Sequence, residues 1–516
     1  MTARRVAVAP IAVATVAIGL GVWQILPGVG YWDTAEFQTV PPILGTAHPT
    51  GYPTYVILGW LASALLTPLG EPAFRMNLLS AILVGVAAGL TVDLVRLLTR
   101  STLVGVAAGI GLVATPLAWS IATHADPHAL HLAFVAALLW LLVRWEQARS
   151  ADPDRADRWL VAAAAVTGLS IGNHSLTFLL GLPIALYVLG VEPGILRRQR
   201  LVALCTAALV IPMVLVYLEL PLRGGAIAGL KAPLVYGRPD TLGGFVSIVT
   251  GEQFRGGINN PFADLPRKVA DLASLAARQL GPLALLVVPG FIVTAIRFPA
   301  YALLTGSAMA ITCFFNAAYV NAEIDRYYLG PALIVWTWLA VLAATVVDLV
   351  VGGSRAPPAG SRRRRLQVFS LAATALAGVL LISPTISTLP DRAAIIDRSQ
   401  DRGAELWVDA VLAELEPRAI VVSWWSYSTS LWYAQQIQGR RLDVFVADDR
   451  TRLDLNLGEV TDVIDNNLGV RPVYVIRAGA GEISQLAERY MLVPLASSTA
   501  GNVFRVTARV SASADR

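Results

Sequence analysis

The sequence predicts a polytopic α-helical membrane protein with about eleven transmembrane helices and a small C-terminal extracytoplasmic α/β domain. The chain has 516 residues, of which 55% are hydrophobic and only 15% charged, and its mean hydropathy is +0.61. This composition is too apolar for an ordinary soluble protein. Apolar runs of membrane-spanning length recur up to Ser387, and short strand-like runs then alternate with amphipathic stretches.

The membrane helices are predicted from run length, because a span needs about 20 mainly apolar residues. The first run follows Arg4 and Arg5 and lacks a convincing signal-peptide cleavage site, so we expect an uncleaved helix. Two short runs flank Asn173 and His174, and they predict either two short helices or one long helix. The predicted spans are 6–26, 76–96, 102–119, 129–145, 159–172, 175–190, 201–220, 281–297, 300–319, 327–350 and 366–386.

The distribution of arginine predicts the orientation, because short cytoplasmic loops are enriched in Lys and Arg. With a cytoplasmic N-terminus the pattern holds only if 159–190 crosses the membrane twice, and the C-terminus is then extracytoplasmic. We therefore expect a multi-pass protein of the plasma (inner) membrane. The predicted cytoplasmic loops contain Arg96, Arg100, Arg144, Arg149, Arg155, Arg158, Arg197, Arg198, Arg200, Arg297, Arg355 and Arg362 to Arg365.

The apolar segment 54–70 fits this scheme poorly as a span, because it ends in Pro and Gly and has no basic flank. We expect it to lie as a helix at the outer membrane surface, within a first outer loop at 27–75. The alternative is that it crosses the membrane. In that case the later loops would invert and the arginine clusters would face outward.

The chain is predicted to divide into a membrane domain at 1–388, with a second long outer loop at 221–280, and an extracytoplasmic domain at 389–516. Strands are expected at 419–424, 442–448, 472–478 and 502–510. Helices are expected at 426–438 and 480–490. This alternation is typical of a small α/β layer, and the domain contains no GxGxxG, Walker or CxxC motif.

The composition also excludes some partners and sites. Lys231 and Lys268 are the only lysines, so the basic balance reflects arginine at membrane flanks, and we expect no nucleic-acid partner. Cys205 and Cys313 both lie in apolar runs, where a buried hydrophobic role is more typical than a disulfide or a metal site.

Ionisable residues gather on the predicted outer face. Such groups near a membrane usually line a cavity or pathway, so we expect a shared outer cavity, with ordinary loop polarity as the alternative. All five histidines lie in or beside outer loops, namely His48, His124, His128, His131 and His174. The same face receives Asp33, Glu36, Asp126, Arg223, Glu252, Arg255, Glu323, Asp325 and Arg326.

The first outer loop carries the strongest candidates for acid–base chemistry. Asp33 and Glu36 have i, i+3 spacing, which places both carboxylates on one face of a helix. One acid could act as a general base while the other orients it. The ordinary alternative is an acidic helix start. "HPTGYP" at 48–53 follows as a stiff turn, and irregular backbone at membrane depth is tolerated chiefly beside a cavity.

A metal site is possible at "THADPHALH", 123–131, where the histidines have helical spacing and Asp33 or Glu36 could complete the ligands. Pro127 and the absence of an HExxH motif argue against it. We therefore expect that no metal is required, and a divalent metal stays possible. Further along the chain, Arg326 is suited to binding a lipid phosphate, whereas Tyr327 and Tyr328 are typical of an aromatic belt.

The stretch "WDTAEFQTVPPILGTAHPTGYPTYVILG" resembles the first-loop signature of a membrane family long labelled as having unknown function. An animal relative of that family is a protein O-mannosyltransferase. The resemblance continues through "RMNLLSAI", "GLSIGNHSLTFLLGLP", "YLELPLRGG", "GRPDTLGGFVSIVTGEQFRG" and "DRYYLGPAL", and "WWSYSTSLWYAQQIQGRRLDV" resembles bacterial members. Tyr31 and Trp32 replace the usual Gly before Asp33. The family is similar to GT-C glycosyltransferases, which use a polyprenyl-phosphate sugar on the extracytoplasmic side.

This resemblance implies a glycosyltransferase that moves a sugar, expected to be mannose, from polyprenyl phosphate to an acceptor hydroxyl with inversion. The expected acceptor is Ser or Thr of a secreted or membrane protein, with a glycan or lipid acceptor as an alternative. By the resemblance Asp33 is the general base and Glu36 assists it. Donor phosphate binding is expected at His48, His174, Arg223, Arg255 and Arg326, and acceptor or sugar binding at Tyr52, His124, Asp126 and Glu252.

Two other classes of function compete with this one. A transporter or lipid flippase would place ionisable residues at mid-membrane depth and on both faces, often with inverted repeats. Here the spans are nearly free of charge and the acids lie on one side. A simple membrane anchor for the C-terminal domain would not need eleven spans.

Overall fold

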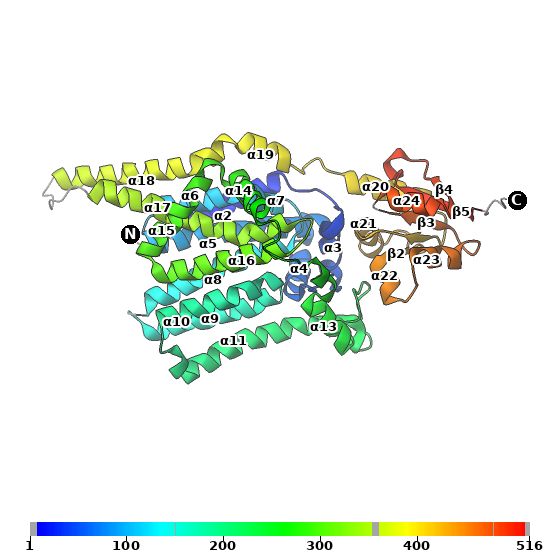
Figure 1. Cartoon of the computed structure of the whole chain (residues 1–516), viewed down its shortest axis with the longest axis horizontal. Helices are drawn as coiled ribbons and strands as arrows, with labels where there is room; N and C mark the ends of the chain where they lie inside the picture. Colours follow the sequence, from blue (N-terminus) through cyan, green and yellow to red (C-terminus); the bar gives the residue numbers. More distant parts are fainter. Residues whose placement is uncertain (1–7, 150, 353–360, 478, 511–516) are drawn as a thin grey trace.

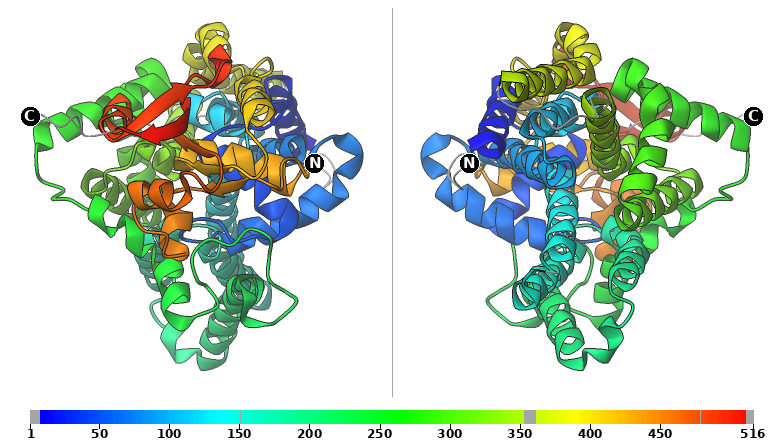
Figure 2. Two further views of the ribbon diagram at one scale, coloured as in Figure 1. Left: turned by 90° about the vertical axis from the view of Figure 1, so that its right-hand side faces the viewer. Right: turned by 90° about the vertical axis from the view of Figure 1, so that its left-hand side faces the viewer.

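The computed structural model describes residues 8–510 other than 150, 353–360 and 478. Figure 1 shows long helices side by side along the long axis, with the strands at one end of the molecule. Seen along that axis, the sheet elements cover one end of the bundle (Figure 2). The fold class predicted from the sequence is confirmed.

The helices of the bundle occupy the predicted apolar runs. Within the described residues, seven helical stretches are long and apolar enough to cross a membrane, and four apolar helices are shorter. The bundle consists of α2 (Val8–Trp23), α5 (Pro72–Thr99), α6 (Thr102–Val113), α8 (Pro127–Ala148), α9 (Pro153–Ile171), α10 (Gly181–Val191), α11 (Gln199–Tyr217), α15 (Val287–Arg297), α16 (Pro299–Ala318), α17 (Leu329–Gly352) and α18 (Ser361–Ser387).

Small residues allow these helices to approach closely. A Cβ atom on Gly85 of α5 would lie 2.5 Å from Ile18 Cγ1 of α2, and a Cβ on Gly105 of α6 would lie 2.6 Å from the carbonyl oxygen of Val92. Contacts of this kind are typical of membrane bundles, where van der Waals packing replaces the hydrophobic effect between helices.

The short runs at 159–172 and 175–190 form two helices rather than one. Helix α9 ends at Ile171, and Gly172 to His174 form a turn before η3 (Ser175–Leu180) and α10. The two-helix alternative is therefore correct. The orientation of the chain stays a prediction, and Arg355 and the side chains of residues 362–365 lie outside the described residues.

The first outer segment folds into α3 (Trp32–Thr39), η1 (Pro41–Ile43), α4 (Pro53–Leu65) and η2 (Thr67–Leu69). The Gln38 amide fixes this segment, because it accepts a hydrogen bond from Gly30 N at 2.8 Å and donates to Gly28 O at 3.0 Å and Asn77 Oδ1 at 2.9 Å. Helix α4 has 13 residues, which is shorter than a membrane span. Its position at the outer membrane surface stays a prediction.

The second long segment and the remaining connections carry short elements. They are α7 (Pro116–Ile121), η4 (Ile195–Arg197), α12 (Glu219–Pro221), η5 (Leu222–Ala226), α13 (Leu242–Thr250), η6 (Glu252–Gly257), α14 (Leu265–Leu280), η7 (Gly281–Leu286), η8 (Ile324–Tyr328) and α19 (Leu389–Ile396). Between η5 and α13, residues 231–240 form a strap that contacts both the first outer segment and the C-terminal part.

The C-terminal part is a five-stranded sheet in the order β2-β1-β3-β5-β4. Strand β1 (Ile420–Val422) pairs in parallel with β2 (Phe445–Ala447) and β3 (Val473–Ile476), whereas β5 (Val503–Arg509) is antiparallel to β3 and β4 (Tyr490–Pro494). The associated helical elements are α20 (Gly403–Glu414), α21 (Trp425–Gln436), α22 (Asp449–Asp454), α23 (Val460–Asn467), α24 (Ala480–Ala487) and η9 (Ser498–Ala500).

The α/β prediction for this part is confirmed, and all four expected strands are present. Strand β4 was not predicted. The expected helix at 480–490 ends at Ala487, and the chain then enters β4 at Tyr490. Its sequence YMLVP is apolar like the other strands, but the expected helix at 480–490 ran into it, and the strand is a mostly exposed edge that ends in Pro.

Candidate active site

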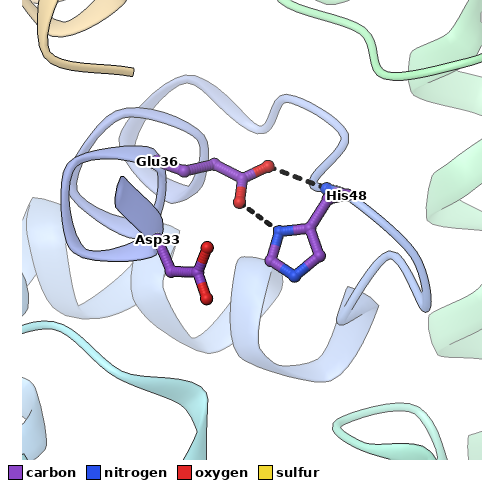
Figure 3. Close-up of side chains that lie close together, drawn as sticks. All are labelled: Asp33, Glu36 and His48. Carbon is purple, nitrogen blue, oxygen red and sulfur yellow. Dashed lines mark hydrogen bonds and ion pairs between the residues drawn. The ribbon is translucent and has the colours of Figure 1, made fainter. Parts of the chain in front are cut away.

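Helix α3 places the two acids of the first outer segment on one face, as their spacing predicted (Figure 3). Glu36 is 2% exposed, whereas the side chain of Asp33 is 32% exposed. Glu36 Oε1 accepts a hydrogen bond from His48 N at 2.7 Å, and Glu36 Oε2 pairs with His48 Nδ1. Both oxygens of Glu36 are thus engaged with His48, and Asp33 is the acid with an accessible carboxylate.

The turn after η1 brings His48 to this pair. Gly51 N donates to His48 O at 2.8 Å, and Gly51 and Tyr52 have φ values of 82° and 48° before α4 begins at Pro53. The left-handed conformation is costly for a bulky residue such as Tyr52, and strain of this kind clusters at functional sites. The turn also places Tyr52 OH 3.2 Å from His48 Nε2.

The charge of His48 is set by its neighbours. Burial alone would lower the pKa of its imidazole, but attraction to Glu36 and then to Asp33 outweighs burial and raises this pKa to about 9. At neutral pH the ring is therefore an imidazolium; burial also raises the pKa of its partner Glu36, and His48 offsets part of that rise. The imidazolium places a positive charge beside Asp33.

Arg326 joins two distant parts of the chain at the same place. Its guanidinium donates to Asp126 Oδ2 at 2.8 Å, lies 3.5 Å from Asp33 Oδ2 and also pairs with Glu323. Burial would raise the pKa of the Asp126 carboxyl, but Arg326 and His128 outweigh burial and hold it well below its ordinary value. Arg326 is thus a half-buried cation in contact with three acids.

Asp126 also fixes the start of α8. As the N-cap residue it accepts a hydrogen bond from His128 N at 2.7 Å, and the same oxygen lies 2.8 Å from His128 Nδ1. The Asp126 carboxylate therefore orients both Arg326 and His128.

A cavity of about 270 Å³ opens in front of these groups. It brings together eight residues that the sequence placed on the outer face or assigned to substrate, and aromatic residues complete the wall. The predicted residues that line it are Asp33, His48, Tyr52, His128, His174, Arg255, Glu323 and Arg326.

His174 lines this cavity in its neutral form. Burial lowers the pKa of its imidazole well below the ordinary value. As the N-cap residue of η3 it accepts from Leu176 N at its Nδ1 atom, at 3.1 Å, so the proton resides on Nε2. That Nε2 atom is buried and has no hydrogen-bond partner among the described residues. It is a donor available to a bound molecule.

Other predicted residues lie outside the cavity wall. Arg223 instead donates to the carbonyl oxygens of Leu44 at 2.7 Å and Ile43 at 3.2 Å, and so supports the first outer segment. Glu252 is exposed and lies 3.9 Å from Arg255.

Two histidines, Asp126 and Glu36 are close to the site without lining it. His124 Nε2 lies 3.9 Å from Asp126 Oδ2, and the His131 ring lies 5.9 Å from the His174 ring. Asp126 and Glu36 act on the cavity through Arg326 and His48. Their predicted roles toward substrate stay predictions.

The residues Asp33, Glu36 and His48 each offer one ligand atom within 4.8 Å of the others, and they could hold a metal ion. Two carboxylates and an imidazole suit a divalent cation. A histidine nitrogen binds a cation only when it carries no proton, so a cation here would compete with the protonated form of His48. The 123–131 histidines form no such group within the described residues. The expectation that no metal is required stays a prediction.

The sequence did not predict that α21 of the C-terminal part packs on α3. Ser430 Oγ donates to the Gly30 carbonyl at 2.7 Å, and Tyr433 OH accepts from Ala73 N at 3.1 Å. The Trp425 ring meets the His48 ring edge to face at 5.8 Å. The C-terminal part therefore supports the acid-bearing helix directly.

Several aromatic residues of the site were also missed. Phe254 and Tyr319 line the cavity. Tyr327, interpreted from the sequence as part of an aromatic belt, lines it too, with its ring 5.4 Å from His128 and 5.5 Å from His174. Their only sequence signal was proximity to Arg255 and Arg326.

The N-terminal half of the chain resembles known transferases. Residues 33–193 match the model of the protein O-mannosyl-transferase TMEM260 N-terminal domain. The chain is 32% identical over 238 residues to the protein O-mannosyl-transferase TMEM260 of Mus musculus, which covers 44% of this chain and 31% of that protein. It is 22% identical over 171 residues to the Dictyostelium discoideum protein of that name, covering 32% and 21%. The chain thus spans less than a third of the length of these curated relatives.

Solved structures share the fold at low sequence identity. The chain superimposes on ArnT from Cupriavidus metallidurans bound to undecaprenyl phosphate with a TM-score of 0.60 and 15% identity, over 98% of both chains. It superimposes on the Archaeoglobus fulgidus oligosaccharyltransferase tethered with an acceptor peptide with a TM-score of 0.54 and 14% identity, over 90% of this chain and 68% of that one. The resemblance to protein O-mannosyl-transferases, predicted from the sequence, is confirmed, and these solved structures show a shared fold.

Proposed function

We propose that this GT-C-like membrane glycosyltransferase moves a sugar from a polyprenyl-phosphate donor to an acceptor hydroxyl, with inversion at the anomeric carbon. The observation that carries this proposal is the accessible Asp33 carboxylate at a cavity whose other groups are the His48 imidazolium, Arg326, Arg255 and the His174 Nε2 donor. A carboxylate facing several cations and donors is suited to taking a proton while negative charge develops opposite it.

In the proposed reaction Asp33 accepts the proton of the acceptor hydroxyl as the hydroxyl oxygen attacks the anomeric carbon of the sugar. The bond between that carbon and the phosphate oxygen breaks, and its electron pair leaves with polyprenyl phosphate. The Arg326 guanidinium lies 3.5 Å from Asp33 Oδ2 and holds this carboxylate in position before the transfer. Glu36 does not take the proton, because both of its oxygens are engaged by His48.

The leaving phosphate is stabilised by the positive wall of the cavity. The Arg255 side chain is 62% exposed and only loosely paired with Glu252 at 3.9 Å, so it is available to bind a phosphate oxygen. The His48 imidazolium and the His174 Nε2 proton add two donors of fixed position. Preorganised donors of this kind stabilise developing charge without further reorganisation.

We infer mannose as the sugar and protein Ser or Thr as the acceptor, on the extracytoplasmic face of the plasma membrane. The relatives named O-mannosyl-transferases support the sugar and the acceptor, and the ArnT structure with undecaprenyl phosphate supports a polyprenyl-phosphate donor. A glycan or lipid acceptor is the alternative that the same geometry would serve.

The test is a transfer assay with purified protein in lipid vesicles. Radiolabelled polyprenyl-phosphate mannose is supplied with a Ser/Thr peptide, a glycan or a lipid acceptor, and guanosine diphosphate mannose replaces the donor in a control. We expect label in the peptide with the lipid-linked donor only. Label in the glycan or lipid alone would reassign the acceptor, and no transfer to any acceptor would refute the function.

A further inference from the structure

A second, larger cavity of about 510 Å³ lies beside the active site, between the strap and the C-terminal sheet. Its floor is β2, which is an edge strand of the sheet. Its walls include Trp432 and Gln436 of α21 and Thr451 of α22, and the strap covers one side. We refer to this cavity as the β2 groove.

Among the described residues, the β2 groove is lined by one residue with unpaired backbone, Val446, which is 6% exposed as a whole. Phe445 N donates to Ala419 O, and Ser423 N donates to Ala447 O, so Phe445 and Ala447 face β1. In a parallel pair the intervening residue points its N–H and C=O away from the partner strand. That residue is Val446, which lines the groove and has no hydrogen-bond partner on its outer side within the described part of the chain. An edge of this kind is a template for another strand.

The side chains around the groove favour a ligand of mixed polarity and low charge. Arg238 pairs with Asp240 at 3.0 Å, and Asp454 pairs with Arg450 at 2.8 Å, which leaves Lys231 as the charged lining residue without an ion pair among the described residues. Leu442 and Leu455 are 69% and 55% exposed and line the same groove. Exposed leucines beside an unpaired strand edge are typical of peptide recognition by strand addition.

The strap connects the β2 groove to the active site. Thr46, two residues before His48, donates from its N to Leu234 O at 3.1 Å and accepts from Tyr236 N at 2.5 Å. The Tyr236 ring packs on Trp425 at 5.6 Å, and Trp425 packs on His48. Two aromatic rings, those of Tyr236 and Trp425, therefore connect the strap beside the groove to His48.

We propose that the β2 groove binds an extended polypeptide segment, which pairs with the free edge of β2. This inference rests on the proposed function, for which it supplies the region that recognises a protein acceptor away from the reacting hydroxyl. The backbone of the segment bonds to Val446, and alternate side chains contact Leu442 and Leu455. The groove thus recognises an unfolded or extended acceptor rather than one specific side chain.

The test measures peptide binding to the full-length protein in lipid nanodiscs by fluorescence anisotropy. The probe is a fluorescein-labelled peptide of about twelve residues with alternating Thr and Val and a Lys at each end. We expect Leu442→Asp and Leu455→Asp each to raise Kd about tenfold, because each removes an apolar contact that the bound peptide would bury. The control Val470→Asp changes a residue that is 81% exposed and outside the groove, and it should leave Kd unchanged.

A second measurement tests strand pairing itself. N-methylation of every second residue of the probe removes the amide protons of one strand edge, because alternate N–H groups face the same side. We expect methylation of one set of alternate residues to abolish peptide binding, and methylation of the other set to leave the Kd unchanged. Equal effects of both sets, equal weakening by Val470→Asp, or no binding by the parent protein would overturn the proposal. So would a concentration-dependent dimer that the groove substitutions dissociate, because a second copy would then occupy the groove.

These outcomes separate the groove from the proposed function. If the peptide binds as predicted but the protein transfers no sugar, the peptide-binding role of the groove stands and the proposed function is refuted. If the protein transfers sugar to the peptide and neither Leu442→Asp nor Leu455→Asp changes the Michaelis constant for the peptide, the proposed function stands. The peptide-binding role of the groove is then refuted. Thermal unfolding of each variant confirms that the substituted proteins are folded.

Discussion

Replacing Glu36 with Gln removes the negative charge that keeps His48 protonated. His48 is only 9% exposed, and burial by itself lowers the pKa of an imidazole. In the parent protein Glu36 and Asp33 outweigh burial and raise this pKa to about 9. Without the Glu36 charge we expect the pKa of His48 to fall to its ordinary value of about 6.5 or below.

The size of the effect follows from these two values. At pH 7.5 a group with a pKa of about 9 is roughly 97% protonated, whereas one with a pKa of about 6.5 is roughly 9% protonated. If the imidazolium stabilises the leaving phosphate, transfer at pH 7.5 should fall about tenfold. The alkaline limb of the pH–rate profile should also move down by about two units or more.

The assay is the initial rate of sugar transfer between about pH 5.5 and pH 10, with Asp271→Asn as a control, since Asp271 is 73% exposed on α14. The control should keep the parent profile. An unchanged alkaline limb in Glu36→Gln would refute the reasoning, because it would show that His48 does not owe its proton to Glu36.

The pairing of His48 with Glu36 also predicts how the stability of the fold changes with pH. The folded pKa of His48 is raised above its unfolded value, so the stabilisation is fully present below about pH 6.5 and is lost as the pH rises through about 9. A shift of this size corresponds to about 3 kcal/mol as an upper bound. The parent Tm should therefore fall between pH 7 and pH 10, and the Tm of Glu36→Gln should fall less. Parallel falls in both proteins would contradict the pairing.

Three further predictions concern the surroundings of Asp33. Arg326→Lys should lower kcat about tenfold to a hundredfold, because one ammonium cannot replace the fork that contacts Asp126 and approaches Asp33; steady-state kinetics with wild-type values would contradict this. Ser430→Ala should lower kcat a few-fold with KM unchanged, because it leaves the buried carbonyl oxygen of Gly30 without its hydrogen bond. The control is Ser428→Ala on the same helix, which removes only an intrahelical hydrogen bond and should have no effect on kcat. Dialysis against a chelator should leave the transfer rate unchanged, and loss of activity restored by one divalent cation would assign the Asp33 cluster to a metal instead.

Local patterns predicted most of the helical architecture and the position of the acid pair. The spans follow from run length, and the i, i+3 spacing of Asp33 and Glu36 is a property of one short helix. The tail strands were visible because each is a compact apolar run. Strand β4 is also an apolar run, YMLVP, but it directly follows the helix expected at 480–490 and was not separated from it.

Contacts between distant segments could not be predicted in the same way. The roles of Asp33 and Glu36 differ only because His48 engages both Glu36 oxygens, and Arg326 approaches Asp33 across 293 residues of chain. Arg223 looked equivalent to Arg326 in the sequence, yet it bonds to backbone carbonyls instead. No periodicity in the sequence distinguishes these cases, because tertiary packing decides which partner each side chain meets.

The most direct test of the account is the single-turnover rate of sugar transfer in Asp33→Asn, measured with saturating donor and acceptor. An asparagine keeps the shape of the side chain and loses the base, so we expect the rate to fall by at least about a hundredfold while donor binding is retained. A rate within about threefold of the parent would contradict the assignment of Asp33 as the base that deprotonates the acceptor.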